Sequence, residues 1–588
     1  MRFFNLFDSH FFNNFLLRYC RIGIAADRRK HIPQISTGKV RGRHAAANFI
    51  IPANTRLSAR MSFHRRAQIP VKSADIILLD TQPHRIHNAN QFFGIGIARP
   101  RRRPQRFTCL DKSSFFHKVA CCFDFSMGKD RQENSNDHKH QKATHFKSFV
   151  FTLIASMVFG HATFAETTDL PRPLVDADFH NIDAMQASLG QKLFYDKILS
   201  GNQNISCGTC HHHRFGGSDG LSLGIGEGGV GVGPTRLPGF GDNRIKKRVP
   251  RNASALWNIG AKEVRVLFQD GRLSVSDDYE NGFNSPAEEW LPNGLDTILA
   301  AQAILPMTAQ FEMAGNPKEN EVAGAAHDRI DAVWPIIAKR VRIIPEYGQL
   351  FVDAFDDVET ADQVDITHIA KALGAFIGQE WRSHDSPFDA FISGDKTALN
   401  ASQKRGLDLF YGKANCASCH SGSLLSDHKF YALALPPFGP GRTRRFDPYV
   451  RDVGRMGESD DLADAYRFKT PQLRNVALTG PYGHNGAYAS LENMVRHHLN
   501  PLQMLDEWQP EMAQLPTAEW LQAIDFVVMS DKREMARQRS HLDITPIDLN
   551  DREIDDLVAF LHSLTGATAL RLPLGVPDTV PSGLPVDK

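Results

Sequence analysis

The chain has 588 residues, of which 42% are hydrophobic and 23% are charged, and its formal net charge is +2. This balance is typical of soluble globular proteins, and it argues against nucleic-acid binding and against intrinsic disorder. A chain of this length is long enough to form several domains.

The first recognisable pattern along the chain is an export signal. Lys147 is followed by a short apolar run that ends at Gly160, and small residues lead up to Ala165. This order is typical of a secretory signal peptide that is cleaved after Ala165. The apolar run is shorter than the roughly 20 residues that span a bilayer, and an uncleaved N-terminal anchor is the alternative. We therefore expect export to the periplasm and no stable membrane span after cleavage.

A signal peptide belongs at an N-terminus, yet a long segment with no sustained helical or strand period precedes this one. We interpret residues 1–126 as a non-native upstream extension, with translation starting at Met127 and the signal peptide covering residues 127–165.

Cysteine use agrees with this division. Of the eight cysteines, the four that lie upstream are Cys20, Cys109, Cys121 and Cys122. The other four belong to two CxxCH motifs, Cys207-Gly208-Thr209-Cys210-His211 and Cys416-Ala417-Ser418-Cys419-His420. We therefore expect no structural disulfide in the exported protein, although its compartment is oxidising.

Each CxxCH motif has the spacing at which two thiols attach one haem and the histidine ligates its iron. Zinc is the alternative, but the two CxxC pairs of a zinc ribbon lie only about 15–20 residues apart. We therefore expect two covalently bound haem c groups, with His211 and His420 as proximal iron ligands. His212 and His213 follow the first motif directly, and we interpret them as incidental surface histidines.

Helical patterns dominate after the signal peptide. Leu399–Phe410 has an Asn/Ser start and apolar residues at helical spacing. Asn550-Asp551-Arg552-Glu553 resembles a capping box, and the amphipathic run behind it is stopped by Gly566. Gly224–Gly241 is rich in glycine and predicts a loop. The expected fold is mostly α with long loops.

The two motifs divide the exported chain into two units. We expect a first haem domain over residues 166–395 and a second over residues 396–588.

Around the two motifs the chain resembles the di-haem cytochrome c peroxidases, with the MauG-like enzymes as relatives. The resemblance covers nearly all of Leu189–Gly566. The segments that carry it, besides the CxxCH motifs, are Leu189–Asp196, Pro250–Asn252, Asp270–Arg272, Phe311–Met313, Ser386–Asp389, Lys469–Val476 and Gly480–Gly486. The resemblance implies two cytochrome c-like domains.

This resemblance implies an enzyme whose first haem is the peroxide site and whose second haem passes electrons from a small external donor. The acid/base glutamate of the family falls on Glu312, and a nearby glutamine on Gln302. A carboxylate in a partly apolar pocket can take a proton from one peroxide oxygen and return it to the other. On local sequence alone, a surface glutamate in a helical turn is the favoured interpretation of Glu312, and the family resemblance reverses that preference.

Three positions depart from the pattern of the family. Glu227 stands where many members carry a histidine that blocks the first iron, which predicts a first haem that is open without reductive activation. Gln269 stands where a tryptophan often lies between the haems, so electron transfer would use Phe268 or Trp257 or no relay at all. We favour the interpretation of Trp257 as a core residue only. Gly480 corresponds to the methionine that ligates the second haem.

The resemblance therefore leaves the distal ligand of the second haem open. Tyr482 is the first candidate, and the rivals are Met456, Met494 and His484. A tyrosine ligand is also what MauG-like enzymes have. Asn252 matches a calcium ligand of the family, although calcium needs six or more oxygens.

Three functions follow from these residues. The first is a periplasmic peroxidase that reduces hydrogen peroxide with electrons from a small cytochrome c or cupredoxin. The second is a MauG-like oxidase that acts on a protein or organic substrate. The third is a di-haem electron carrier without catalysis, against which Glu312 argues. The resemblance is also compatible with a homodimer.

Overall fold

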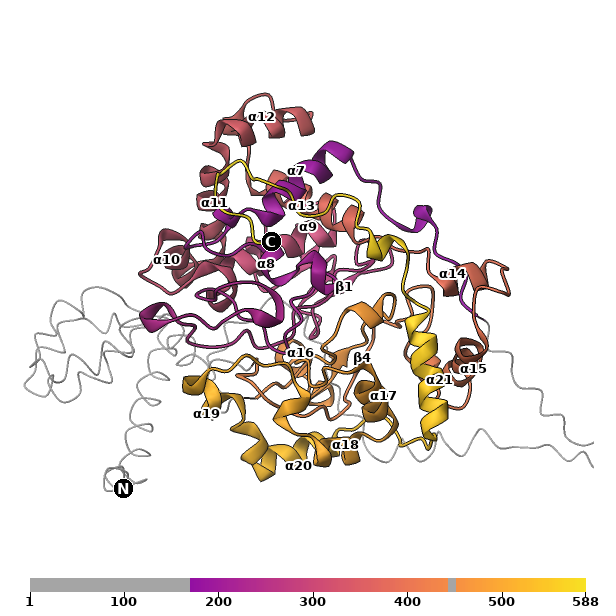
Figure 1. Ribbon diagram of the computed structural model, residues 1–588. Coiled ribbons are helices and arrows are strands. Elements are labelled where there is room, and N and C mark those ends of the chain that lie inside the picture. Colours follow the sequence, from indigo (N-terminus) through magenta and orange to yellow (C-terminus); the bar gives the residue numbers. More distant parts are fainter. Residues whose placement is uncertain (1–169, 443–450) are drawn as a thin grey trace, which may run out of the picture. The chain divides into compact units, whose positions relative to one another are not determined.

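The computed structural model describes residues 170–442 and 451–588, which are mostly helical as expected (Figure 1). The expected upstream extension, signal peptide and upstream cysteines lie outside these residues. The helices are α7 (Ala184–Tyr195), α8 (Cys207–Cys210), α9 (Ile298–Ala303), α10 (Glu321–Asp328), α11 (Val333–Arg342), α12 (Pro345–Ala354), α13 (Ile366–Glu380), α14 (Pro387–Ile392), α15 (Ala401–Tyr411), α16 (Met456–Ser459), α17 (Leu491–Leu499), α18 (Pro501–Glu507), α19 (Gln522–Asp525), α20 (Lys532–Ser540) and α21 (Asp551–His562). In the described part of the chain, no helix combines the length and apolar character that a bilayer crossing requires.

Two small antiparallel sheets accompany the helices. The first sheet has the strand order β1 (Val266–Leu267), β2 (Leu273–Val275) and β3 (Phe283–Asn284). The second pairs β4 (Phe430–Tyr431) with β5 (Phe468–Lys469), in a register that sets Phe430 opposite Lys469. Long loops join the elements. The expected Gly224–Gly241 loop contains one 3₁₀ turn, Gly233–Thr235, and one isolated antiparallel bridge between Val230 and Leu237.

One helical pair organises the larger hydrophobic core. Helices α7 and α13 pack closely, with α9 against α13, and Figure 1 shows the three helices together. The close approach depends on Gly190, because a Cβ atom there would overlap the carbonyl oxygen of Ala372. Phe194 and Phe376 fill the space beside this crossing, with ring centroids 5.1 Å apart.

A second pair, α15 and α21, repeats this arrangement in the smaller core. Gly406 lies against the carbonyl oxygen of Asp556 as Gly190 lies against Ala372. Both helix starts confirm the sequence prediction. Asn400 and Asn550 are the N-caps, and each forms a capping box with the residue three positions on.

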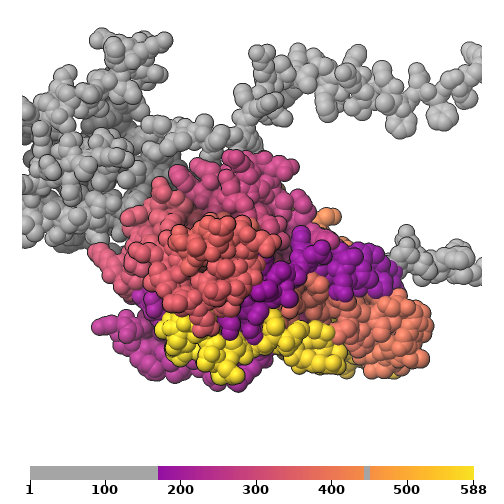
Figure 2. Space-filling view, turned by 90° about the horizontal axis from the view of Figure 1, so that it is seen from above, coloured from indigo at the N-terminus to yellow at the C-terminus, as the bar shows by residue number. Residues whose placement is uncertain are grey.

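The C-terminal residues return from the second helical pair to the larger core. Ala569 and Val580 are buried in that core, and Figure 2 shows the yellow C-terminal residues against the indigo segment that contains α7. Asp587 accepts hydrogen bonds of 2.6 Å from both Lys197 and Thr209. Thr209 lies inside the first CxxCH motif, so the C-terminal segment is bonded directly to that motif.

The two glycine contacts generate a stability prediction. Gly190→Ala and Gly406→Ala should each lower the free energy of unfolding by about 1–3 kcal/mol, because the added methyl group forces a helix pair apart. Gly324→Ala in α10 is the matched control, since a Cβ atom there meets nothing within 4 Å. That control should be neutral or stabilising by up to about 1 kcal/mol. Chemical denaturation of the three variants measures the difference, and equal effects at all three positions would contradict the packing argument.

Candidate functional site

The first CxxCH motif forms one short helix and presents its histidine in a fixed orientation. The main-chain N–H of Ser206 donates to Thr209 Oγ1 at 3.0 Å, which closes the turn of α8. Nδ1 of His211 lies 3.0 Å from the carbonyl oxygen of Gly217. Burial lowers the pKa of His211, so a neutral imidazole with a proton on Nδ1 leaves Nε2 for a metal.

The second motif is built in the same way. Cys416–Ser418 forms a single 3₁₀ turn, and Nδ1 of His420 lies 3.1 Å from the carbonyl oxygen of Leu425. Burial, helped by the nearby His498, lowers the pKa of His420 to about 4. All four motif cysteines are free thiols, and burial raises the pKa of Cys207 and of Cys416 to about 12.

These residues fit two covalently attached haem groups. Each motif offers two unpaired thiols and one neutral imidazole whose Nδ1 is occupied by a main-chain carbonyl. A carbonyl partner on Nδ1 is the usual device that orients a histidine for metal ligation.

Glu312 lies beside the first motif in an unusual piece of backbone. It belongs to a π-helical turn, Gln310–Ala314, a conformation that is common at functional sites. Gly226 of the glycine-rich loop packs directly on this turn, so that a Cβ atom there would overlap the carbonyl oxygen of Phe311 and lie 3.1 Å from the Cα atom of Glu312. Glu312 is also close enough to Cys210 to raise the pKa of that thiol, although burial is the larger cause. The structure therefore brings Glu312 and the first motif together.

The environment of Glu312 suits proton transfer. Its side chain is half-buried. Burial raises the pKa of Glu312 above its ordinary value, while the positive charges of Arg272 and Arg442 oppose the increase. Gln302 lies half-buried in α9, and a 3₁₀ turn, Pro306–Thr308, joins that helix to the segment that carries Glu312.

Glu227 is fixed by hydrogen bonds to the preceding loop. Its Oε1 accepts from Nδ2 of Asn202 and from Nδ2 of Asn204, each at 2.7 Å. Arg236 holds the same loop from inside, since its guanidinium donates to the carbonyl oxygens of Ile225 at 2.6 Å and Gly226 at 2.9 Å. The loop that passes Glu312 is thus a constrained part of the fold.

The interpretation of His212 and His213 as surface residues is wrong. His212 is 1% exposed, and its Nδ1 accepts from the N–H of Arg214 at 3.2 Å. His213 is bonded to the hydroxyl of Tyr195, and its Nε2 lies 2.7 Å from the buried carboxylate of Glu380. The two partners of His213 come from α7 and α13, which is why the local sequence did not reveal them.

Gln269 lies where two distant segments of the chain meet. Its Nε2 donates to the carbonyl oxygen of Asn252 at 3.0 Å and to Oγ of Ser254 at 2.9 Å. The N–H of Lys469 donates to the carbonyl oxygen of Gln269 at 2.8 Å. Trp257 is 3% exposed and belongs to the larger core, which agrees with its reading as a core residue.

The side-chain amide of Asn252 is hydrogen-bonded within the protein. Nδ2 of Asn252 donates to the carbonyl oxygen of Leu221 at 2.8 Å. The main-chain N–H of Asn252 donates to the carbonyl oxygen of His484 at 2.9 Å. Among the described residues, no cluster of three or more His, Cys, Asp or Glu side chains could hold a metal ion. A calcium ion at Asn252 stays a prediction from the family resemblance.

A buried ion cluster lies close to these residues. Asp270 is 1% exposed. Its Oδ2 accepts hydrogen bonds from Arg272 and Arg442, each at 3.1 Å, and forms an ion pair with Arg251 at 2.7 Å. Arg251 also pairs with Asp452, through bonds of 2.7 and 2.8 Å. Two carboxylates thus hold three guanidinium groups that come from both halves of the chain.

The four candidates for the distal ligand of the second haem are dispersed. Tyr482 donates its hydroxyl to the carbonyl oxygen of Val476 at 3.1 Å, and burial raises the pKa of Tyr482 to about 12. The ring of His484 stacks on Phe468, with centroids 3.6 Å apart. Met494 packs on the cluster that contains Phe438 and Trp508, and Met456 on the cluster that contains Ala432 and Tyr466.

His498, which the sequence analysis did not consider, is the aromatic neighbour of His420. The two ring centroids are 6.4 Å apart. The tandem His497-His498 is the signal in the sequence that could have drawn attention to it.

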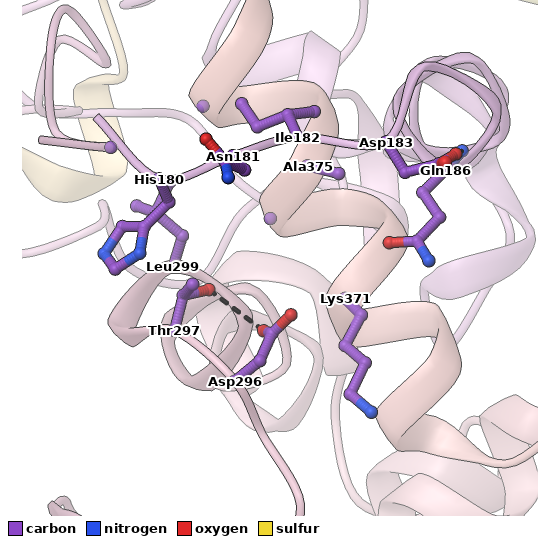
Figure 3. A pocket seen from close by; sticks show the side chains of 13 residues that line it. His180, Asn181, Ile182, Asp183, Gln186, Asp296, Thr297, Leu299, Lys371 and Ala375 are labelled. Atoms are coloured by element: carbon purple, nitrogen blue, oxygen red, sulfur yellow. Dashed lines mark hydrogen bonds between the residues drawn. The ribbon is translucent and has the colours of Figure 1, made fainter. Parts of the chain in front are cut away.

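A separate polar pocket lies among α7, α9 and α13 (Figure 3). His180, Gln186, Asp296 and Lys371 are among its lining residues. None of the predicted site residues lines it, and it does not extend the haem site.

Comparison with known proteins identifies the family of the chain. The family model described as "Di-haem cytochrome c peroxidase" matches residues 184–397. Cytochrome-c peroxidase IdrP1 of Denitromonas iodatirespirans is 31% identical over 363 residues, which cover 58% of this chain and 79% of that protein. The chain belongs to the di-haem cytochrome c peroxidase family.

Relatives within this family carry two kinds of name. The methylamine utilization protein MauG of Methylorubrum extorquens is 28% identical over 410 residues, covering 69% of this chain and 85% of that protein. Cytochrome c551 peroxidase of Pseudomonas aeruginosa is 28% identical over 400 residues, covering 68% and 83%. Among solved structures, a MauG-like protein associated with microbial copper homeostasis aligns at a TM-score of 0.44 and 24% identity, over 70% of this chain and 99% of that chain. As a member of the di-haem family, the chain is an oxidoreductase that uses haem c.

The buried ion cluster generates a prediction about stability and pH. Burial alone would raise the pKa of Asp270, but Arg251, Arg272 and Arg442 hold that pKa well below its ordinary value. Asp270 therefore stabilises the fold above its unfolded pKa of about 3.9, and this contribution is lost as the pH falls below about 4. Asp270→Asn should cost about 3–5 kcal/mol at neutral pH and flatten the acid side of the stability curve.

Asp578→Asn is the control, because Asp578 forms an exposed pair with Lys588 and such pairs contribute about 0–1 kcal/mol. Denaturation midpoints between pH 3 and pH 7 measure both variants. If Asp270→Asn lowers the free energy of unfolding no more than Asp578→Asn does, the ion cluster does not stabilise the fold as argued.

Proposed function

We propose that the chain is a periplasmic di-haem c-type peroxidase that reduces hydrogen peroxide to water with electrons from a small cytochrome c or cupredoxin. Cys207, Cys210 and His211 would hold the peroxide-binding haem. The second haem, which accepts and stores electrons, would be held by Cys416, Cys419 and His420. The family supports haem c at these motifs, and the export signal supports the periplasm.

The position of Glu312 carries the proposal. A haem held by the first motif supplies the electrons that break the peroxide O–O bond. Glu312 takes the proton from the peroxide oxygen nearer the iron and returns it to the departing oxygen, which leaves as water. A carboxyl group whose pKa is raised by burial suits both steps, because it accepts and releases a proton at little cost. Gln302 would orient peroxide through its amide.

Two features of the surrounding loop support a first haem that is open to peroxide. Glu227, at the position of the blocking histidine in many relatives, has its carboxylate held by Asn202 and Asn204. Gly226 leaves no room for a side chain between the loop and the π-helical turn of Glu312. A loop held in this way needs no rearrangement before peroxide enters.

A MauG-like oxidase that removes electrons from a protein or organic substrate is the second candidate. Gln269 favours it, because its amide is bonded to Asn252 and Ser254 and offers no aromatic relay between the two haem sites. The MauG relative covers more of this chain than IdrP1 does, although its identity is lower.

Glu312→Gln tests the proposed function. The variant should keep both haem groups and lose about 10²–10⁴-fold in kcat/KM for peroxide, because the amide cannot accept the proton. For the unmodified enzyme, kcat/KM should fall as the pH drops through the raised pKa of Glu312, since the protonated acid cannot serve as base. Steady-state peroxide turnover with a reduced donor cytochrome measures both effects.

Glu321→Gln is the matched control, an exposed glutamate paired with Arg340 at 3.0 Å, and it should retain full activity. Equal activity in Glu312→Gln and Glu321→Gln would overturn the peroxidase proposal. Slow turnover by the unmodified enzyme, with a long-lived oxidised species after peroxide, would favour the MauG-like oxidase instead.

A further inference from the structure

A second histidine faces the proximal histidine of the second motif. His498 lies in α17, and its ring centroid is 6.4 Å from that of His420, with the ring planes tilted by 58°. Helix α17 packs against α21, the helix that frames the smaller core. Two segments far apart in the sequence thus bring two imidazoles together at the second motif.

The separation of the rings fits a metal ion between them. Metal–imidazole bonds are about 2.0–2.1 Å long, and a ring centre lies roughly 1 Å from its own nitrogen, so two imidazoles on opposite sides of one metal have centres about 6 Å apart. The 6.4 Å between His420 and His498 leaves room for one iron ion.

The hydrogen bonds of the two rings match. Nδ1 of His498 lies 2.9 Å from the carbonyl oxygen of Met494, one turn earlier in α17. Nδ1 of His420 lies 3.1 Å from the carbonyl oxygen of Leu425. Each carbonyl fixes a proton on Nδ1 and leaves Nε2 as the ring nitrogen available to a metal.

The neighbouring histidine of α17 makes a contrast. Nδ1 of His497 bonds the hydroxyl of Tyr488 at 2.9 Å, and Nε2 of His497 lies 2.8 Å from the carbonyl oxygen of Leu433. Both nitrogens of His497 are therefore occupied within the protein.

We propose that His498 is the distal ligand of the second haem, which would then be held between two imidazoles. The proposal rests on the haem assigned to Cys416, Cys419 and His420 under the proposed function. With both imidazoles bound, this iron would be six-coordinate and closed to peroxide. They also give it a lower potential than a histidine and methionine pair would, since a methionine ligand raises the potential.

Substitution of His498 in the full-length, haem-loaded protein tests the proposal. Electron paramagnetic resonance of the ferric protein should show a low-spin signal from the second haem that is lost in His498→Ala. Added imidazole should restore that signal in the variant. His498→Met should keep the iron low-spin and shift its reduction potential upward.

Tyr482→Phe is the control, because it removes only the hydroxyl of the rival ligand. This variant should leave the low-spin signal and the potential of the second haem unchanged. A signal that survives His498→Ala, or one that changes in Tyr482→Phe instead, would overturn the assignment of His498.

Haem content separates this test from that of the proposed function. Intact mass should show two haem groups on each variant. If the unmodified protein carries no haem on Cys416 and Cys419, the haem assignment itself is refuted. Two haems with the signal unchanged in His498→Ala would refute only the distal ligand.

Discussion

The buried carboxylate of Asp270 is the interaction on which the arrangement of the two haem sites depends. It holds Arg251 and Arg272 from the first half of the chain and Arg442 from the second. Arg251 continues the connection to Asp452. A buried cluster of this kind is stable only when every charge has a partner, so it fixes the relative positions of the segments that meet there. Because Arg272 and Arg442 also act on the pKa of Glu312, the joint between the halves and the proton chemistry share the same charges.

The two halves of the chain share one type of helix packing, and they differ in the residues that surround it. In each half a glycine, Gly190 or Gly406, lets two helices cross against a carbonyl oxygen, and a CxxCH histidine is oriented by a main-chain carbonyl. The difference arises on the other side of each proposed haem. Beside the first motif lie a constrained loop and Glu312, and next to His420 lies the imidazole of His498. The shared frame suits the same cofactor in both proposed sites, and the different surroundings agree with the proposal that only the first one takes peroxide.

Local patterns predicted local structure well. The capping boxes at Asn400 and Asn550 depend on residues three positions apart, and the CxxCH motifs lie within five residues each. The partners of His213 and His498 could not be predicted in this way, because Glu380 and His420 reach them only after the helices have packed. The return of Asp587 to Thr209 was missed for the same reason.

The central claim is that one haem is open to exogenous ligands and the other is closed. Cyanide titration of the oxidised, fully haem-loaded protein tests it most directly, with each haem followed by its own spectroscopic signal. The account predicts that one haem per chain binds cyanide and that the low-spin haem does not change. Binding at both haems, or at neither, would contradict it.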